Sequence, residues 1–128
     1  MVTIQHASVY ADDPKRAADA LAAICGGRAA PFSPLPGAWV CFFSGGAFLE
    51  LYPRTARLKD LGDDVGFEPL PAPATGAGTH FNLRLHRTRE DVEKACAALG
   101  LKCAQRPGLG FLDVWIEESL LVECVCAG

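Results

Sequence analysis

The sequence contains no long apolar run, no cluster of basic residues and no Cys-x-x-C pair. A helix needs roughly 20 consecutive apolar residues to span a bilayer, so we expect no membrane segment. The net charge is −3, and without a Lys- or Arg-rich stretch neither nucleic acid nor an anionic membrane surface is an expected partner. The absence of Cys-x-x-C pairs argues against a zinc ribbon.

The first residues also lack the basic segment and the following apolar segment of a secretory signal, which predicts a cytoplasmic protein. Six cysteines are scattered through the chain, and in a reducing compartment we expect free thiols rather than a disulfide framework. With 128 residues, half of them hydrophobic, the chain is long enough for a single domain, residues 1–128, with a sizeable core.

The scarce histidines reveal an internal repeat. Only three are present, and His6 falls on His80 when the sequence is shifted by 74 residues. A shift of 73 residues places Glu50 on Glu123 together with its apolar neighbours. One residue lost after the first helix reconciles the two shifts. A repeat of this kind predicts two copies of one structural unit.

Each copy, residues 1–53 and 79–128, is expected to form one strand, one helix and three further strands. Asp13 and Thr88 are suited to begin the helices, and Gly26 and Gly100 to end them. The pattern predicts an α+β fold of two βαβββ repeats. Strands are expected near 2–10, 28–32, 38–44, 47–52, 79–86, 102–106, 110–116 and 120–126.

Residues 54–78 form the linker between the two copies. Their prolines and glycines argue against long regular elements, although Ala56–Leu61 are compatible with a short helical turn. A connection of this length usually has a function or spans a distance.

Alternation of side chains along the strands places the repeated His and Glu on the polar faces. In the strand near 79–86, the apolar face packs on the helices, and the opposite face carries His80, Asn82 and Arg84. Glu50 and Glu123 lie among apolar residues, where an ionised carboxylate is costly unless it is paired or bound to a cation.

We therefore predict that two imidazoles and two carboxylates, those of His6, Glu50, His80 and Glu123, converge on one divalent cation. Such ligands suit Zn, Ni, Co, Mn or Fe(II) and leave room for water. An alternative interpretation is two hydrogen-bonded polar histidines and two rim glutamates. That alternative does not explain why both residue types recur at equivalent positions.

These features resemble the vicinal oxygen chelate superfamily, the group of glyoxalases, bleomycin-resistance proteins and extradiol dioxygenases. The resemblance covers nearly the whole chain. It rests on the two βαβββ units and on Ile4-Gln5-His6, Thr79-His80-Phe81, Phe48-Leu49-Glu50-Leu51-Tyr52-Pro53 and Leu120-Leu121-Val122-Glu123-Cys124. It implies a curved, cup-like mixed sheet with helices on the outside and one divalent metal ion per site. It also implies a homodimer whose site is built within one chain or between two.

Ligands at all four positions imply the glyoxalase I-like end of the superfamily, a lyase or isomerase acting on a small substrate with vicinal oxygens. The metal would polarise these oxygens, and Glu123 or Glu50 would move a proton α to a carbonyl. Arg84, Asn82 and Tyr52 are candidate substrate contacts, with a rim ion pair or core packing as the alternative. A dioxygenase, a thiol transferase-type resistance enzyme and a non-catalytic drug-binding protein remain open.

Overall fold

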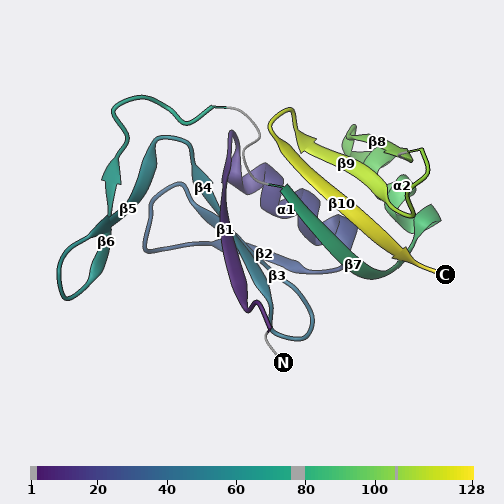
Figure 1. Ribbon diagram of the computed structural model, residues 1–128, viewed down its shortest axis with the longest axis horizontal. Coiled ribbons are helices and arrows are strands. Elements are labelled where there is room, and N and C mark those ends of the chain that lie inside the picture. The colour runs from purple at the N-terminus through teal and green to yellow at the C-terminus, as the bar shows by residue number, and fades with distance from the viewer. Residues whose placement is uncertain (1–2, 76–79, 106) are drawn as a thin grey trace.

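The computed structural model describes residues 3–75, 80–105 and 107–128. These residues form two βαβββ modules and a separate hairpin (Figure 1). Module one consists of β1 (His6–Ala11), α1 (Pro14–Cys25), β2 (Arg28–Pro31), β3 (Trp39–Phe42) and β4 (Phe48–Pro53). The hairpin consists of β5 (Ala56–Asp60) and β6 (Val65–Pro69). Module two consists of β7 (His80–Thr88), α2 (Arg89–Leu99), β8 (Lys102–Gln105), β9 (Leu112–Glu117) and β10 (Leu120–Ala127).

Each module contains one four-stranded sheet, and the two sheets have the same topology. Their strand orders are β1-β4-β3-β2 and β7-β10-β9-β8. In both, the first strand of the module lies at one edge, parallel to the last strand, and the remaining neighbours are antiparallel. The predicted α+β fold of two βαβββ repeats is confirmed. Among the described strands the two sheets are not hydrogen-bonded to each other.

The helices begin and end where the sequence predicts. The side chains of Asp13 and Thr88 accept hydrogen bonds from backbone amides three residues later, at 3.1 and 3.2 Å. Gly26 and Gly100 follow the helices with φ of 76° and 69°, a left-handed conformation that glycine adopts without strain. Within the described ranges, neither helix has the length and apolar character needed to cross a bilayer.

The helix α1 lies between the two sheets (Figure 1) and contacts β2, β3 and β4 of module one as well as β7 and β9 of module two. Its buried side chains are Pro14, Ala17, Ala18, Ala20, Leu21 and Ile24. Because alanines allow neighbours to approach closely, this helix can be covered on more than one side. α2 packs on β7, β8 and β10 of its own module and also contacts α1. We expected both helices on the outside of the sheets, but α1 lies between them (Figure 1).

One hydrophobic cluster joins the modules. It contains Leu21 of α1 and Leu51 of β4, and also Val92 of α2 and Val114 of β9, all fully buried. Burial of one such aliphatic side chain contributes about 1.5–3 kcal/mol. The two modules therefore stabilise each other through a shared core.

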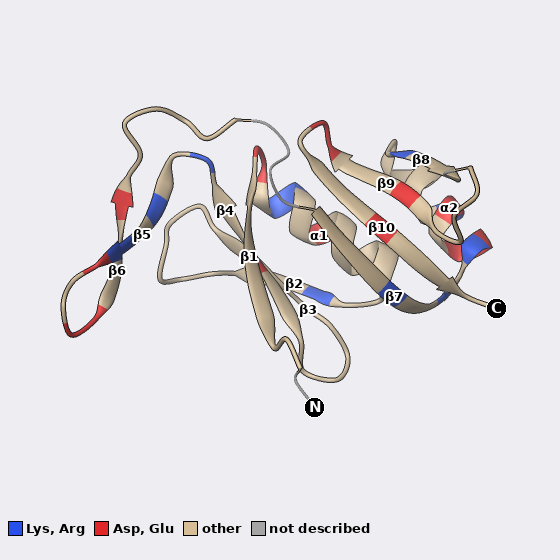
Figure 2. Cartoon of the chain, in the orientation of Figure 1, with Lys and Arg blue, Asp and Glu red and all other residues tan. Residues whose placement is uncertain are grey.

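The segment 54–78 forms a hairpin where the sequence suggested a short helical turn over Ala56–Leu61. β5 pairs antiparallel with β6 over five residue positions, and the ring of Phe67 packs edge-on against Tyr52 with the ring centroids 5.5 Å apart. Acidic residues gather at the hairpin tip (Figure 2). The helical interpretation is wrong because pairing with β6 and packing on Tyr52 are not visible in the local sequence.

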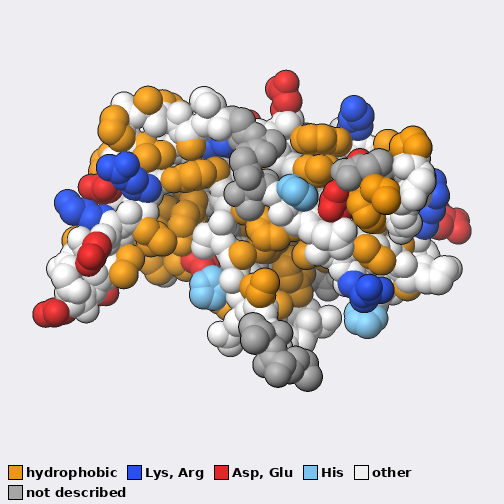
Figure 3. Space-filling model, in the orientation of Figure 1, with side chains coloured by type: hydrophobic (Ala, Val, Ile, Leu, Met, Phe, Trp, Pro, Cys, Tyr) orange, Lys and Arg blue, Asp and Glu red, His pale blue; other side chains and the backbone are white. Residues whose placement is uncertain are grey.

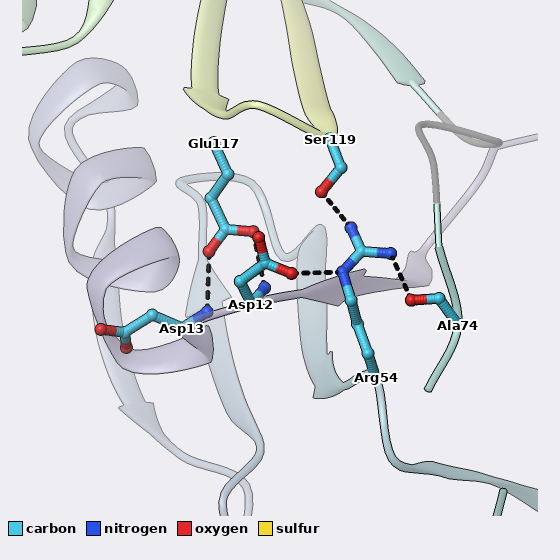
Figure 4. A network of polar contacts seen from close by, with 6 residues as sticks. All are labelled: Asp12, Asp13, Arg54, Ala74, Glu117 and Ser119. Carbon is cyan, nitrogen blue, oxygen red and sulfur yellow. Dashed lines mark hydrogen bonds and ion pairs between the residues drawn. The ribbon is translucent and has the colours of Figure 1, made fainter. Parts of the chain in front are cut away.

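A polar network fastens the first module and the linker to the β9–β10 turn (Figure 4). The carboxylate of Glu117 accepts hydrogen bonds from the backbone amides of Asp12 and Asp13, at 2.6 and 2.7 Å. The guanidinium of Arg54 pairs with Asp12 at 2.6 Å and also donates to the hydroxyl of Ser119. These contacts fix the orientation of one module relative to the other.

Candidate metal centre

The first His–Glu pair lies on neighbouring strands of module one, on the sheet face opposite α1. Nε2 of His6 is 3.4 Å from Oε2 of Glu50. The imidazole stacks on the ring of Phe48, with centroids 4.7 Å apart and planes 8° from parallel. The His6 side chain is 48% exposed whereas that of Glu50 is 7% exposed. A buried carboxylate therefore lies beside an accessible imidazole nitrogen.

Module two repeats this arrangement with β7 and β10. Nε2 of His80 is 3.9 Å from Oε1 of Glu123, and their side chains are 59% and 10% exposed. Nδ2 of Asn82 donates to the same carboxylate oxygen at 3.3 Å. The structure thus pairs each predicted histidine with the glutamate of its own repeat.

The two pairs do not meet within one chain. In the part of the chain that the structure describes, no group of three or more His, Cys, Asp or Glu side chains could hold a metal ion. The pairs belong to separate sheets with α1 between them, and histidine side chains appear at separate places on the surface (Figure 3). The chain presents two separate His–Glu pairs, one in each module, and we call each pair a candidate half-site.

Each half-site has the donor chemistry that a divalent cation needs. One imidazole nitrogen and one carboxylate oxygen face each other, and these donor types suit Zn, Ni, Co, Mn and Fe(II). A carboxylate buried among apolar side chains is stabilised by a bound cation. The residues present therefore fit half of a metal site in each module.

Tyr52 touches the first half-site. Its hydroxyl donates to Oε1 of Glu50 at 3.0 Å and receives a hydrogen bond from Oγ of Ser8 at 3.3 Å. Burial raises the pKa of Tyr52, and the neighbouring Glu50 raises it further, while the Ser8 contact lowers it. The phenol therefore stays protonated at neutral pH and acts as a hydrogen-bond donor.

Two polar neighbours of the half-sites escaped the sequence prediction, Ser8 and Asp113. Asp113 lies directly opposite Glu123 in the β9–β10 pairing, where module one has Val40 opposite Glu50. Both β9 and β10 carry acidic residues (Figure 2). Alternation along β9 could have placed Asp113 on this face, but its partner depends on the register set by the β9–β10 turn.

Arg84 and Asn82 share the sheet face of His80, as predicted. Both side chains are exposed, and Asn82 contacts Glu123. Tyr52, the third candidate substrate contact, is buried and hydrogen-bonded as described above. The substrate roles of all three stay predictions.

Comparison with known proteins identifies the fold. No protein-family model and no curated protein sequence matches the chain. Among solved structures, it is similar to a lactoylglutathione lyase from Agrobacterium tumefaciens, with a TM-score of 0.56, 19% identity and coverage of 95% of this chain and 92% of that one. A possible glyoxalase from Bacillus cereus gives a TM-score of 0.64 and 14% identity, with coverage of 98% and 100%.

A third similar structure is the fosfomycin resistance protein FosX from Mesorhizobium loti. Its TM-score is 0.57 at 16% identity, with coverage of 97% of this chain and 91% of that chain. These three proteins are members of the vicinal oxygen chelate superfamily. At such low identity the likeness establishes architecture and not activity. The chain shares its paired βαβββ fold with these three structures.

Proposed function

We propose that the protein is a divalent-metal-dependent lyase or isomerase of glyoxalase I-like type that acts on a small substrate with vicinal oxygens. The observation that carries this proposal is the repeated pair, a buried glutamate beside an accessible histidine on equivalent strands of both modules. The lactoylglutathione lyase from Agrobacterium tumefaciens shares this architecture, and we extend its reaction class to the chain as part of the proposal.

The complete site is proposed to form in a homodimer, with His6 and Glu50 of one chain facing His80 and Glu123 of a second copy. Each half-site supplies two ligands, and four ligands leave coordination positions for water or substrate. α1 fills the space between the sheets, which keeps the two half-sites of one chain apart. Twofold symmetry would then create two equivalent sites per dimer.

A bound divalent cation would supply Lewis-acid polarisation of the substrate oxygens. Side chains of the protein would transfer the proton. Glu123 is the preferred base: its carboxylate would take the proton from the carbon α to the carbonyl and return it to the former carbonyl carbon. The hydroxyl proton would pass to the former carbonyl oxygen, so that no external oxidant or reductant is needed. The exposed guanidinium of Arg84 can bind a carboxylate or phosphate on the substrate.

Metal analysis of protein purified without chelators tests the site. We expect about one divalent ion per chain, since two equivalent sites would form per dimer. A His6→Ala/His80→Ala double variant should retain little metal, because each half-site loses its imidazole. Equal metal content in both proteins would reject the site.

Mixing variants tests whether the site is shared between chains. Homodimers of His6→Ala or of His80→Ala have one imidazole missing from every site. After subunit exchange, each mixed dimer would contain one intact site and one site lacking both imidazoles. Random exchange should restore about a quarter of the wild-type metal capacity. No restoration would show that the ligands meet within one chain.

Proton transfer can be tested without knowing the natural substrate. We expect the metal-loaded protein to exchange the α-hydrogen of a small α-hydroxycarbonyl compound with deuterium from solvent, measured by NMR under anaerobic conditions. Glu123→Gln should reduce exchange by about 10²–10⁴-fold. Full exchange by a Glu123→Gln protein that keeps its metal would show that Glu123 is not the base. Activity that requires oxygen would instead indicate a dioxygenase.

A further inference from the structure

The two carboxylate oxygens of Glu50 have different partners. Oε1 accepts the hydrogen bond of the Tyr52 hydroxyl at 3.0 Å, while Oε2 faces Nε2 of His6 at 3.4 Å. We infer that Tyr52 is a positioning residue, which fixes Glu50 so that Oε2 is presented beside His6 for the cation. This inference rests on the proposed function and adds a determinant of metal affinity to the described half-site.

Tyr52 can fix Glu50 because its own position is fixed. Its side chain is packed against Phe32 and Phe67, with ring centroids 5.9 and 5.5 Å away. Its hydroxyl also accepts a hydrogen bond from Ser8 at 3.3 Å. A buried ring held on two sides and at its tip has little rotational freedom, so the hydrogen bond restricts rotation of the Glu50 carboxylate.

Module two lacks this arrangement. The repeat places Val125 at the position equivalent to Tyr52 and Asn82 at the position equivalent to Ser8. Asn82 contacts Glu123 directly, at 3.3 Å. The phenol that orients a glutamate is therefore particular to module one, and removing it should alter only the Glu50 side of the metal site.

Titration of the metal-free, full-length protein with Co²⁺ tests the inference. In Tyr52→Phe the ring and its packing remain, but the donor to Glu50 is lost. We expect Co²⁺ to bind about 10–100-fold more weakly, the usual effect of removing a partner of a ligand. The visible absorption spectrum of bound Co²⁺ should also change, because an unfixed carboxylate changes the coordination geometry. A loss of packing alone would not alter the spectrum.

Tyr10→Phe is the matched control. Tyr10 lies on the same sheet face, but its hydroxyl donates to the backbone carbonyl of Ala56 at 2.9 Å. We expect wild-type Co²⁺ affinity and spectrum from this variant. Ser8→Ala, which removes the hydrogen bond to Tyr52, should weaken Co²⁺ binding by less than Tyr52→Phe. Thermal unfolding of each variant confirms that binding is measured on folded protein.

The possible results separate this inference from the proposed function. Wild-type affinity and spectrum in Tyr52→Phe, with normal Co²⁺ binding by the parent protein, would overturn the positioning role and leave the metal site intact. Equal losses in Tyr52→Phe and Tyr10→Phe would also overturn it, because the effect would not pass through Glu50. A wild-type protein that binds no Co²⁺ would reject the proposed function and this inference with it.

Discussion

At the residue scale, the cysteines behave as small apolar side chains. All six are free thiols. Burial raises the pKa of Cys25 and of Cys96 to about 12, and the pKa of Cys41 to about 11. A thiol that stays protonated is a weak nucleophile and a weak metal ligand. These cysteines therefore contribute packing to the shared core rather than chemistry.

This predicts a loss of stability at alkaline pH. In the unfolded chain the Cys25 thiol would ionise near its ordinary pKa of 9.0, whereas in the fold burial raises this pKa to about 12. The unfolded state thus releases its proton first, so the stabilisation present below pH 9 disappears as the pH rises toward 12. Urea unfolding of the wild type should show a steeper decline from about pH 8 to about pH 10.5 than Cys25→Ala. Parallel declines in the two proteins would contradict this expectation.

The His–Glu pairs were predictable because duplication marks them twice, as His6 with Glu50 and as His80 with Glu123. The hydrogen bonds that connect Ser8, Tyr52 and Glu50 were not predictable. It depends on the register that places Ser8 opposite Glu50 and Tyr10 opposite Tyr52. Parallel pairing between segments more than 40 residues apart leaves no local signal in the sequence.

At the element scale, the turn between α1 and β2 depends on Gly27. A Cβ atom at this position would lie 2.4 Å from the backbone oxygen of Phe42 and 3.3 Å from Sγ of Cys41. The missing side chain is what allows the α1–β2 turn to lie close to the backbone of β3. The glycine is required here by contact, since its φ does not lie in the left-handed region.

Gly27→Ala should therefore lower the free energy of unfolding by about 1–3 kcal/mol, the range for overpacking a close contact. Gly110→Ala is the control, since a Cβ there would meet nothing within 4 Å and should change stability little. Chemical denaturation of both variants measures the difference. Equal stability of the two variants would show that the α1–β2 turn accommodates the added Cβ atom without loss of free energy of unfolding.

Element positions were largely readable from the sequence, whereas the hairpin was not. Caps such as Asp13 and Gly26 act on their immediate neighbours, so their effect is local and visible. β5 forms because it pairs with β6 and because Phe67 packs on Tyr52. Those contacts outweigh the local composition that suggested a helical turn.

At the scale of the whole molecule, the placement of the modules depends on contacts between residues far apart in sequence. The amide of Asp12 and the carboxylate of Glu117 are separated by 105 residues. Arg54 adds contacts to Asp12 and to Ser119. A repeat in the sequence predicts the modules but not their mutual orientation, because the orienting contacts are not repeated.

Glu117→Ala should weaken the association of the modules. Two backbone amides lose a charged acceptor, which we expect to cost about 1–2 kcal/mol at this partly exposed position. The melting temperature should fall by roughly 3–8 °C. Glu118→Ala, at the exposed neighbouring position of the same turn, should leave it nearly unchanged. Similar melting temperatures for both variants would show that the Glu117 contacts do not stabilise the association of the modules.

The two-sided burial of α1 means that the halves of this duplicated chain are no longer interchangeable. At the positions equivalent to the buried Ala17 and Ala20 of α1, α2 carries the exposed charged residues Asp91 and Lys94. In a chimaera built from two copies of module two, these side chains would occupy the space that alanines fill in the native chain. Burying unpaired charge is far costlier than burying alanine. The two copies of the repeat therefore have different structural roles, because the helix of module one packs on the strands of both sheets and the helix of module two packs on the strands of one.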